Sequence, residues 1–191
     1  MIPQANRLQH VQEYYFSRKL REVRQLAAEG HPVINMGIGS PDLSPSPEVL
    51  QTLKDAVEEM GAHQYQSYQG LPELRQTIAA FYHRKFWVTL DPDSEVLPLM
   101  GSKEGIMHIA MTFLEKGDEV LVPNPGYPAY RSVSNLTGAT IREYSLEASA
   151  GWAPDLDQLA ATDLSRVKIM WVNYPNMPTG ARADLSFFQR L

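Results

Sequence analysis

The sequence lacks cysteine, clusters of basic residues and long hydrophobic runs. Because there is no cysteine, neither a disulfide framework nor a thiolate metal site can form, which is compatible with a reducing compartment. The net charge of -5 gives no indication of binding to nucleic acid or anionic lipid, and it favours a small polar ligand as the partner. No apolar run approaches the length of a membrane span, and the first residues lack the pattern of a secretion signal. We therefore expect a cytoplasmic protein.

The residues that are present are typical of a globular protein, with 43% hydrophobic and 20% charged residues. The spacing of apolar residues predicts a helix that ends at Gly30, a second that begins after Ser46, and a third over about Pro72 to Phe86. Between the first two helices, "VINM" predicts a short strand that is followed by irregular chain. We assign residues 1–60 to an N-terminal arm with part of a small domain, and residues 61–191 to an incomplete large domain.

From Glu95 onward, strand-like and helix-like segments alternate along the chain. Strands separated by helical segments form crossover units with parallel pairing, and both faces of a parallel sheet must be covered. The sequence therefore predicts an α/β fold with a mainly parallel sheet and helices on both faces. The expected strands are "EVLPLM", "DEVLVP", "ATIREYSL" and "VKIMWVNY", and the expected helices are "KEGIMHIAMTFLEKG", "YPAYRSVSNLTG", "DLDQLAAT" and "ADLSFFQRL".

Three polar segments follow the ends of expected strands, where ligands collect in an open parallel sheet. In "LPLMGSKEGI", a strand leads through Gly101, Ser102 and Lys103 into a helix. Backbone N–H groups, the helix dipole and the serine hydroxyl can converge there on a phosphate. The same junction is common without any ligand, so this segment alone favours an ordinary helix cap.

The other two segments are equally ambiguous when each is taken alone. "VPNPGYPAY" presents Tyr127 on a proline-rich loop, where its ring can stack on a flat ligand or pack in the core. "VNYPNMPTG" brings Asn173 and Asn176 to the same edge of the sheet, although asparagine-rich turns are usually only turns.

Together, the ordered motifs resemble one family. "VINMGIGSPD", "YQSYQGLPELR", "MGSKEGI", "VPNPGYPAY" and "NYPNMPTG" are similar to the N-terminal half of class I/II aminotransferases, which are fold-type I pyridoxal-phosphate enzymes. The resemblance covers nearly the whole chain and implies a homodimeric enzyme of amino acid metabolism, with pyridoxal 5′-phosphate (PLP) as cofactor. It also implies transfer of an amino group between an α-amino acid and a 2-oxo acid, with 2-oxoglutarate as one expected partner.

The resemblance assigns roles to individual residues. The turn at residues 101–103 matches the phosphate-binding turn, whose lysine contacts the phosphate through its backbone N–H, and Tyr127 matches the residue that lies on the pyridine ring. Tyr65 matches the tyrosine that reaches the phosphate bound by the partner subunit. Ile38 and Gly39 match the substrate pocket, where the glycine backbone approaches the substrate carboxylate.

The sequence departs from the family pattern at Met177. Members of the family usually read Asn-Pro-Thr-Gly here, and that asparagine donates a hydrogen bond to the phenolic oxygen of the cofactor. A thioether cannot donate, and a charge-assisted hydrogen bond is worth roughly 1.5 to 3 kcal/mol. Asn173 and Asn176 are the alternative donors. The resemblance also predicts a cis peptide bond between Met177 and Pro178.

Several residues needed for catalysis do not match any part of the chain. In the family pattern, the Schiff-base lysine, the acidic partner of the pyridinium nitrogen and the arginine that binds the substrate carboxylate all lie beyond Leu191. The 5 histidines are scattered without metal-ligand spacing, so no metal site is expected. We therefore expect a fragment of an aminotransferase that is inactive by itself.

Two other functions remain open. The same scaffold also hosts lyases, decarboxylases and synthases, since fold does not determine the reaction. A non-catalytic remnant that holds a phosphate or simply dimerises is the second alternative. A dinucleotide site at "GIG" is disfavoured, because no third glycine or later acidic residue follows in register.

Overall fold

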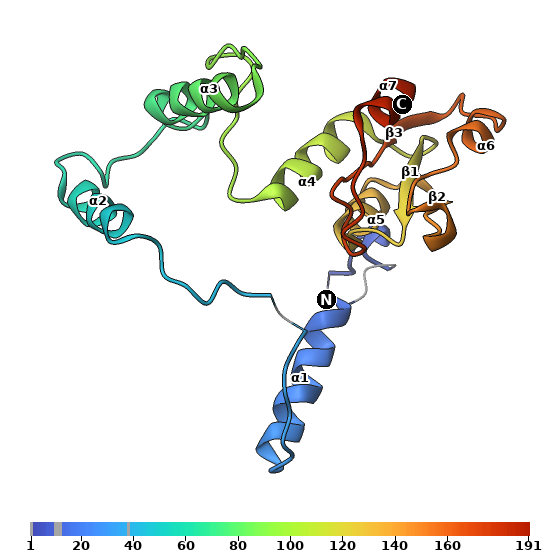
Figure 1. Cartoon of the computed structure of the whole chain (residues 1–191), viewed down its shortest axis with the longest axis horizontal. Helices are drawn as coiled ribbons and strands as arrows, with labels where there is room; N and C mark the ends of the chain where they lie inside the picture. The colour runs from blue at the N-terminus through green and yellow to red at the C-terminus, as the bar shows by residue number, and fades with distance from the viewer. Residues whose placement is uncertain (1, 10–12, 38) are drawn as a thin grey trace. The chain divides into compact units, whose positions relative to one another are not determined.

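The computed structural model describes residues 2–9, 13–37 and 39–191. These residues belong to two units, and each is described by itself: a sheet unit of Met1–Gln12 with Leu99–Leu191, and a helical unit of Glu13–Pro98. Figure 1 shows the elements of both units along the chain. The expected boundary at residue 60 divides the chain at a different place, and the assignment of an arm, a small domain and a large domain stays a prediction.

The sheet unit is built on three parallel strands in the order β2-β1-β3, which are β1 (Glu119–Asn124), β2 (Thr140–Ser145) and β3 (Val167–Met170). β1 lies in the centre and pairs with β2 along its whole length. Every residue of β1 except Asn124 is buried, which explains the apolar run at residues 120–123.

Helices cover both faces of this sheet, as the sequence predicted. On one face, Val120 and Val122 pack with Ile106, Ala110 and Tyr130, which belong to α4 and α5. On the opposite face, Leu121 packs with Tyr144, Leu146 and Leu159, the last of which lies in α6. The helices of this unit are η1 (Asn6–Leu8), α4 (Ser102–Phe113), α5 (Pro128–Thr137), η2 (Ala148–Ala150), α6 (Leu156–Ala160) and α7 (Leu185–Arg190). η1 packs against α5.

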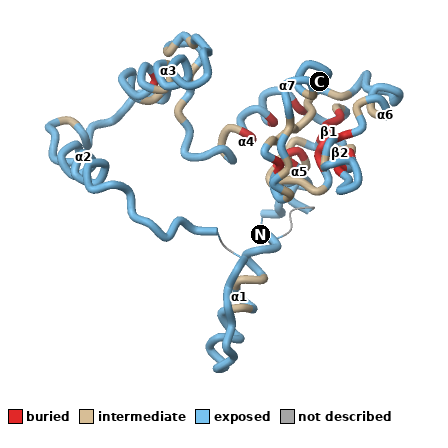
Figure 2. Tube along the Cα trace, viewed as in Figure 1, coloured by how far each residue is buried: buried red, intermediate tan, exposed pale blue. Residues whose placement is uncertain are grey.

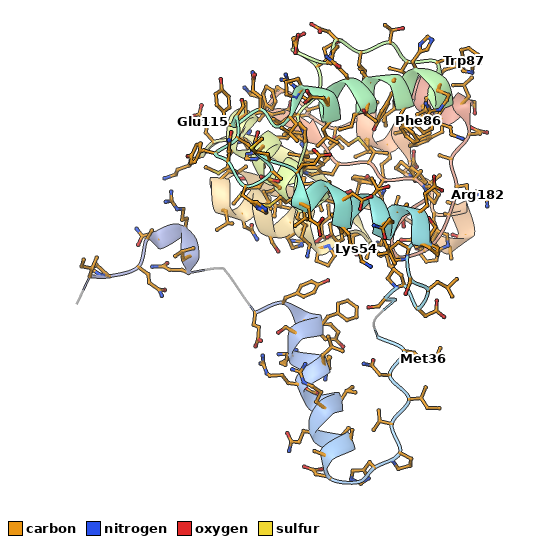
Figure 3. All side chains as sticks on the ribbon, turned by 90° about the vertical axis from the view of Figure 1, so that its left-hand side faces the viewer. Met36, Lys54, Phe86, Trp87, Glu115 and Arg182 are labelled. Carbon is orange, nitrogen blue, oxygen red and sulfur yellow. The ribbon has the colours of Figure 1, made fainter. Side chains whose placement is uncertain are left out.

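The helical unit contains the three helices that were predicted there: α1 (Tyr15–Ala28), α2 (Pro47–Glu58) and α3 (Pro72–Phe86). The hydroxyl of Ser46 accepts a hydrogen bond from the backbone N–H of Val49 and caps α2, whose first residue is a proline. α3 ends at Trp87, which adopts a left-handed conformation with φ 58°. Figure 3 shows Phe86 and Trp87 together at this end of α3.

The apolar core lies in the sheet unit. Figure 2 shows buried residues around β1, β2, α4 and α5, and among the described residues the buried hydrophobic ones all lie between Ile106 and Leu146. Among the described residues of the helical unit, only Arg75 is buried, and it donates to the side chains of Gln69 and Asp93. No helix in the described ranges combines the length and the apolar character of a membrane span.

Two expected strands are wrong. The segments "VINM", residues 33–36, and "EVLPLM", residues 95–100, form no regular strand. A strand needs a neighbour with which to share backbone hydrogen bonds, and Pro98 has no N–H to donate. At the first segment, the side chain of Asn35 accepts from the N–H of Gly37 and forms a local bend instead.

Candidate active site

The N-terminus of α4 forms a turn that exposes backbone donors. Gly101 is the residue before the helix, with φ 111° and ψ 159°, a conformation that residues with a side chain rarely adopt. The carboxylate of Glu104 accepts from the N–H of Met100 at 2.6 Å, and the N–H of Glu104 donates to the carbonyl of Gly101 at 3.2 Å. The N–H groups at the start of a helix have no intrahelical acceptor, so this turn offers donors to an anion.

Lys103 occupies an unfavourable position for a cation, the first turn of a helix. A positive charge near the N-terminus opposes the helix dipole, and such conflicts with local preference are expected mainly at functional sites. Its ammonium nitrogen lies 5.8 Å from the centre of the Tyr127 ring. The turn therefore places two features side by side, a positive end for an anion and the flat face of an aromatic ring.

The loop that follows β1 determines where Tyr127 lies. The peptide bond between Asn124 and Pro125 is cis. A Cβ atom on Gly126 would lie 2.4 Å from the carbonyl oxygen of Pro123, so no residue other than glycine fits this loop without a shift of the backbone. Tyr127 then precedes α5 as its N-cap residue, and its side chain is partly buried.

Aromatic contacts connect Tyr127 to the segment that follows β3. The ring of Tyr127 meets the ring of Tyr130 edge to face, with centres 5.6 Å apart and planes at 82°. Tyr130 in turn stacks on Trp171 with centres 4.9 Å apart and planes at 10°. Since Trp171 comes two residues before Asn173, the three predicted segments lie at the same end of the sheet.

The two asparagines of the third segment have different surroundings. Asn176 is buried, and its side-chain oxygen accepts from the hydroxyl of Thr179 at 2.8 Å, so this amide holds the turn together. The side-chain oxygen of Asn173 accepts from the N–H of Met177 at 3.1 Å. Asn173 is only partly buried, whereas Asn176 is 4% exposed, so the NH2 group of Asn173 is the more accessible donor for a ligand.

Met177 is 49% exposed, and the peptide bond between Met177 and Pro178 is cis, as predicted. Its thioether offers no hydrogen-bond donor at this position of the loop.

The remaining predicted site residues belong to the helical unit. Tyr65 and Gly39 are both exposed, and Ile38 lies outside the described residues. Their roles, like those of the residues in the sheet unit, stay predictions. No group of His, Cys, Asp or Glu side chains suited to a metal ion occurs within the described ranges.

Sequence reasoning missed the aromatic residues behind Tyr127. Tyr130 lies three positions after Tyr127 in "YPAY", and this spacing places it on the adjacent turn of the helix, which was the available signal. Trp171 was included only as part of an apolar strand. Burial raises the pKa of Tyr130, and burial also raises the pKa of Tyr144, whose hydroxyl donates to the backbone carbonyl of Trp171 at 2.6 Å. Both tyrosines are therefore neutral at physiological pH.

The comparison with known families decides what kind of protein this is. The family model for aminotransferases of class I and II matches residues 31–191. The chain belongs to this family. Over 187 residues it is 43% identical to LL-diaminopimelate aminotransferase of Dehalococcoides mccartyi strain BAV1. The matched region covers 98% of this chain and 48% of that protein. It is 38% identical over 191 residues to the same enzyme of Aquifex aeolicus, covering 100% of this chain and 49% of that protein.

Solved structures of the family have the same arrangement of elements. BacF of Bacillus subtilis superposes with a TM-score of 0.90 at 35% identity, over 98% of this chain and 48% of that one. Alanine aminotransferase of Pyrococcus furiosus superposes with a TM-score of 0.89 at 32% identity, over 98% of this chain and 48% of that one. These matches confirm the predicted family and the α/β fold, and the chain spans about half the length of the curated relatives it matches.

Proposed function

We propose that this chain is part of a PLP-dependent aminotransferase, which transfers an amino group between an α-amino acid and a 2-oxo acid. Membership of the family supports the type of reaction. The observation that carries the proposal is the position of Lys103 next to the Tyr127 ring, in the first turn of α4, where the helix dipole favours an anion. An anion and a flat ring are the two parts of PLP that a protein can hold without covalent chemistry.

The residues on this side of the sheet fit the cofactor part by part. The backbone N–H groups of the turn at residues 101–103 and the hydroxyl of Ser102 are suited to the phosphate. The ring of Tyr127 is suited to the pyridine ring, and the NH2 group of Asn173 is suited to the phenolic oxygen. When bound, PLP supplies an electron sink that allows the bonds at the substrate α-carbon to break.

In this proposal, the residues of the chain bind and orient but do not transfer protons at the α-carbon. Ser102 and the helix dipole hold the phosphate, and Tyr127 sets the plane of the ring. Asn173 stabilises negative charge on the phenolic oxygen, in place of the asparagine that the family usually has at position 177. The catalytic lysine is assigned by the family resemblance to a segment that these 191 residues do not contain.

The names of the relatives favour LL-diaminopimelate as the amino-group donor, with 2-oxoglutarate as the expected acceptor. We also propose a homodimer, in which Tyr65 of each subunit reaches the cofactor phosphate of the other. The exposed position of Tyr65 in the helical unit is compatible with this role.

One observation favours a second candidate function. The exposed thioether of Met177 stands where the family resemblance places a donor to the cofactor. A non-catalytic chain that only dimerises would tolerate this change. Such a chain would not need to bind the cofactor, so cofactor binding separates the two candidates.

The experiment measures binding of pyridoxine 5′-phosphate, which has the ring and the phosphate of PLP but no aldehyde that could react with lysines. The variant Ser102→Asp introduces a carboxylate at the proposed phosphate site. At about 4 Å in water, repulsion between this charge and a phosphate of about two charges costs about 2 kcal/mol. We therefore expect affinity to fall about thirtyfold.

The matched control is Gln158→Glu, which adds the same charge to the first turn of α6. Both substitutions place an acid where the helix dipole favours it, so neither should destabilise its helix. Equal affinities of the two variants would contradict a phosphate site at α4. No binding of pyridoxine 5′-phosphate by the unmodified chain would favour the non-catalytic candidate. With the same preparation and PLP, transfer from LL-diaminopimelate to 2-oxoglutarate above the rate of free PLP would contradict the absence of the catalytic lysine.

A further inference from the structure

A second layer of aromatic rings lies behind Tyr127, and the proposed function gives it no role. Tyr130 is 8% exposed and presents its ring to Tyr127 edge to face. On its other side it stacks almost parallel on Trp171. The three rings therefore form a series. It runs from the partly buried Tyr127 at the candidate site, its outer end, through the core residue Tyr130 to the partly buried Trp171 next to β1, its inner end.

The inner end of this series is fixed by the backbone of Trp171. Its N–H donates to the carbonyl of Leu121 in β1 at 3.0 Å, and its carbonyl accepts from the hydroxyl of Tyr144 at 2.6 Å. Trp171 is thus attached to the central strand and to β2 at the same time. Tyr144 is itself buried, so this attachment lies inside the core.

The indole of Trp171 has an unusual environment. Its Nε1 atom is buried and has no hydrogen-bond partner among the described residues. This is unusual, because buried donors are almost always paired. Since Nε1 has no partner, no side-chain hydrogen bond holds this ring in place. Stacking on Tyr130 and the two backbone hydrogen bonds hold it instead, which indicates that the flat face of the ring is the useful part of the side chain.

The Tyr127 ring, at the outer end of the series, packs against the core cluster that contains Tyr130, and the ammonium group of Lys103 lies 5.8 Å from its centre. The loop backbone at Tyr127 is fixed by the close approach of Gly126 to Pro123. The Tyr127 side chain still has two torsion angles, and the ring contact recorded on its inner side is the edge contact with Tyr130. Removal of the Tyr130 ring would leave space into which the Tyr127 ring could turn.

We propose that Tyr130 and Trp171 are positioning residues, which hold the Tyr127 ring at the angle at which it covers the flat ring of the cofactor. This inference rests on the proposed function, because it needs a ligand ring on the outer face of Tyr127. It assigns no contact with the ligand to either residue. Their effect reaches the ligand only through the orientation of Tyr127.

The test compares Tyr130→Leu with Tyr130→Phe in the 191-residue chain, using two ligands. Pyridoxine 5′-phosphate contacts both the turn and the ring, whereas inorganic phosphate contacts only the turn. Tyr130→Leu should weaken binding of pyridoxine 5′-phosphate about 2- to 12-fold, the range expected for one aromatic pair. It should leave binding of inorganic phosphate unchanged. Tyr130→Phe keeps the ring, and it should bind both ligands like the unmodified chain.

Each outcome has a distinct meaning. If the unmodified chain binds pyridoxine 5′-phosphate no more tightly than inorganic phosphate, the proposed function fails. If it does bind more tightly but Tyr130→Leu has no effect, or reduces the affinity for both ligands by the same factor, the positioning role is wrong. Trp171→Leu provides a second variant at the inner end of the series, and it must reduce the affinity for pyridoxine 5′-phosphate selectively as well.

Discussion

The buried carboxylate of Glu119 should make Arg142 important for the stability of the sheet unit. Glu119 begins β1, and its side chain is only 7% exposed. It accepts from Arg142 of β2 at 2.8 Å and also from Arg166, which precedes β3. Arg142 further donates to the carbonyl of Asp163 at 2.5 Å and to the hydroxyl of Thr162 at 3.0 Å. The Glu119 side chain thus connects β1 to β2 and to the residue that immediately precedes β3.

The size of the effect of Arg142→Ala follows from these contacts. The hydrogen bond between the charged groups of Arg142 and Glu119 is worth about 1.5–3 kcal/mol, and each exposed bond from Arg142 to a neutral oxygen is taken as about 0.5–1.5 kcal/mol. Two facts reduce the sum: Arg166 still neutralises Glu119, and the side chain of Arg142 is itself 29% exposed. We therefore expect the free energy of unfolding to fall by about 2–4 kcal/mol.

Arg131→Ala is the matched control. Arg131 forms an ion pair with Glu143, the neighbour of Arg142 on β2, but the two side chains are 46% and 41% exposed. Exposed pairs of this kind are worth about 0–1 kcal/mol.

Urea unfolding followed by tryptophan fluorescence measures both variants in a Trp87→Phe background, so that the signal comes from the sheet unit alone. The reasoning would be refuted if Arg142→Ala lowered the free energy of unfolding no more than Arg131→Ala does.

Two further predictions concern the loop after β3 and the last helix. Met177→Asn should add a donor at a half-exposed position and raise the affinity for pyridoxine 5′-phosphate about tenfold, which is about 1.4 kcal/mol. The control Met177→Leu adds no donor and should leave this affinity unchanged. Equal affinities of the two variants would show that this position does not face the ligand. The carboxylate of Asp184 accepts from the N–H of Phe187, which lowers its pKa below the usual value of 3.8. This contribution to the stability of α7 is therefore present above pH 3.8 and is lost as the pH falls through the lowered pKa. Amide exchange at Phe187 should be faster in Asp184→Ala at neutral pH, and a difference that persists below that pKa would contradict the cap.

Local chemistry was sufficient to predict the helices from the sequence. Ser46 and Pro47 mark the start of α2, and the glycine after α5, Gly138, adopts the left-handed conformation that ends a helix, with φ 82°. The strands at residues 33–36 and 95–100 could not be judged in the same way. Their apolar residues match a strand, but a strand also needs a partner strand, which can lie far away in the sequence. Neither of these two segments pairs with another strand within the described parts of the chain.

The candidate site was predictable to the extent that it depends on strand ends. Tyr127 follows an expected strand that the structure confirms, β1, and so its place at this edge was predictable. The strand expected before Lys103 did not form, so the position of Lys103 beside Tyr127 did not follow from strand ends. The stack of Tyr130 on Trp171 was not predictable, because it depends on how α5 packs against the chain beyond β3. Asn173 and Asn176 look equivalent in the sequence, and only their different burial in the folded loop distinguishes them.

The central position of β1 has a consequence for how the chain acquires its shape during synthesis. β1 pairs on one side with β2, which follows it closely, and on the other side with β3, which follows only after α6. One edge of β1 therefore stays open while the intervening residues emerge from the ribosome. Both contacts of Trp171, with β1 and with β2, form only when β3 arrives, so the aromatic support of Tyr127 assembles later than the pairing of β1 with β2.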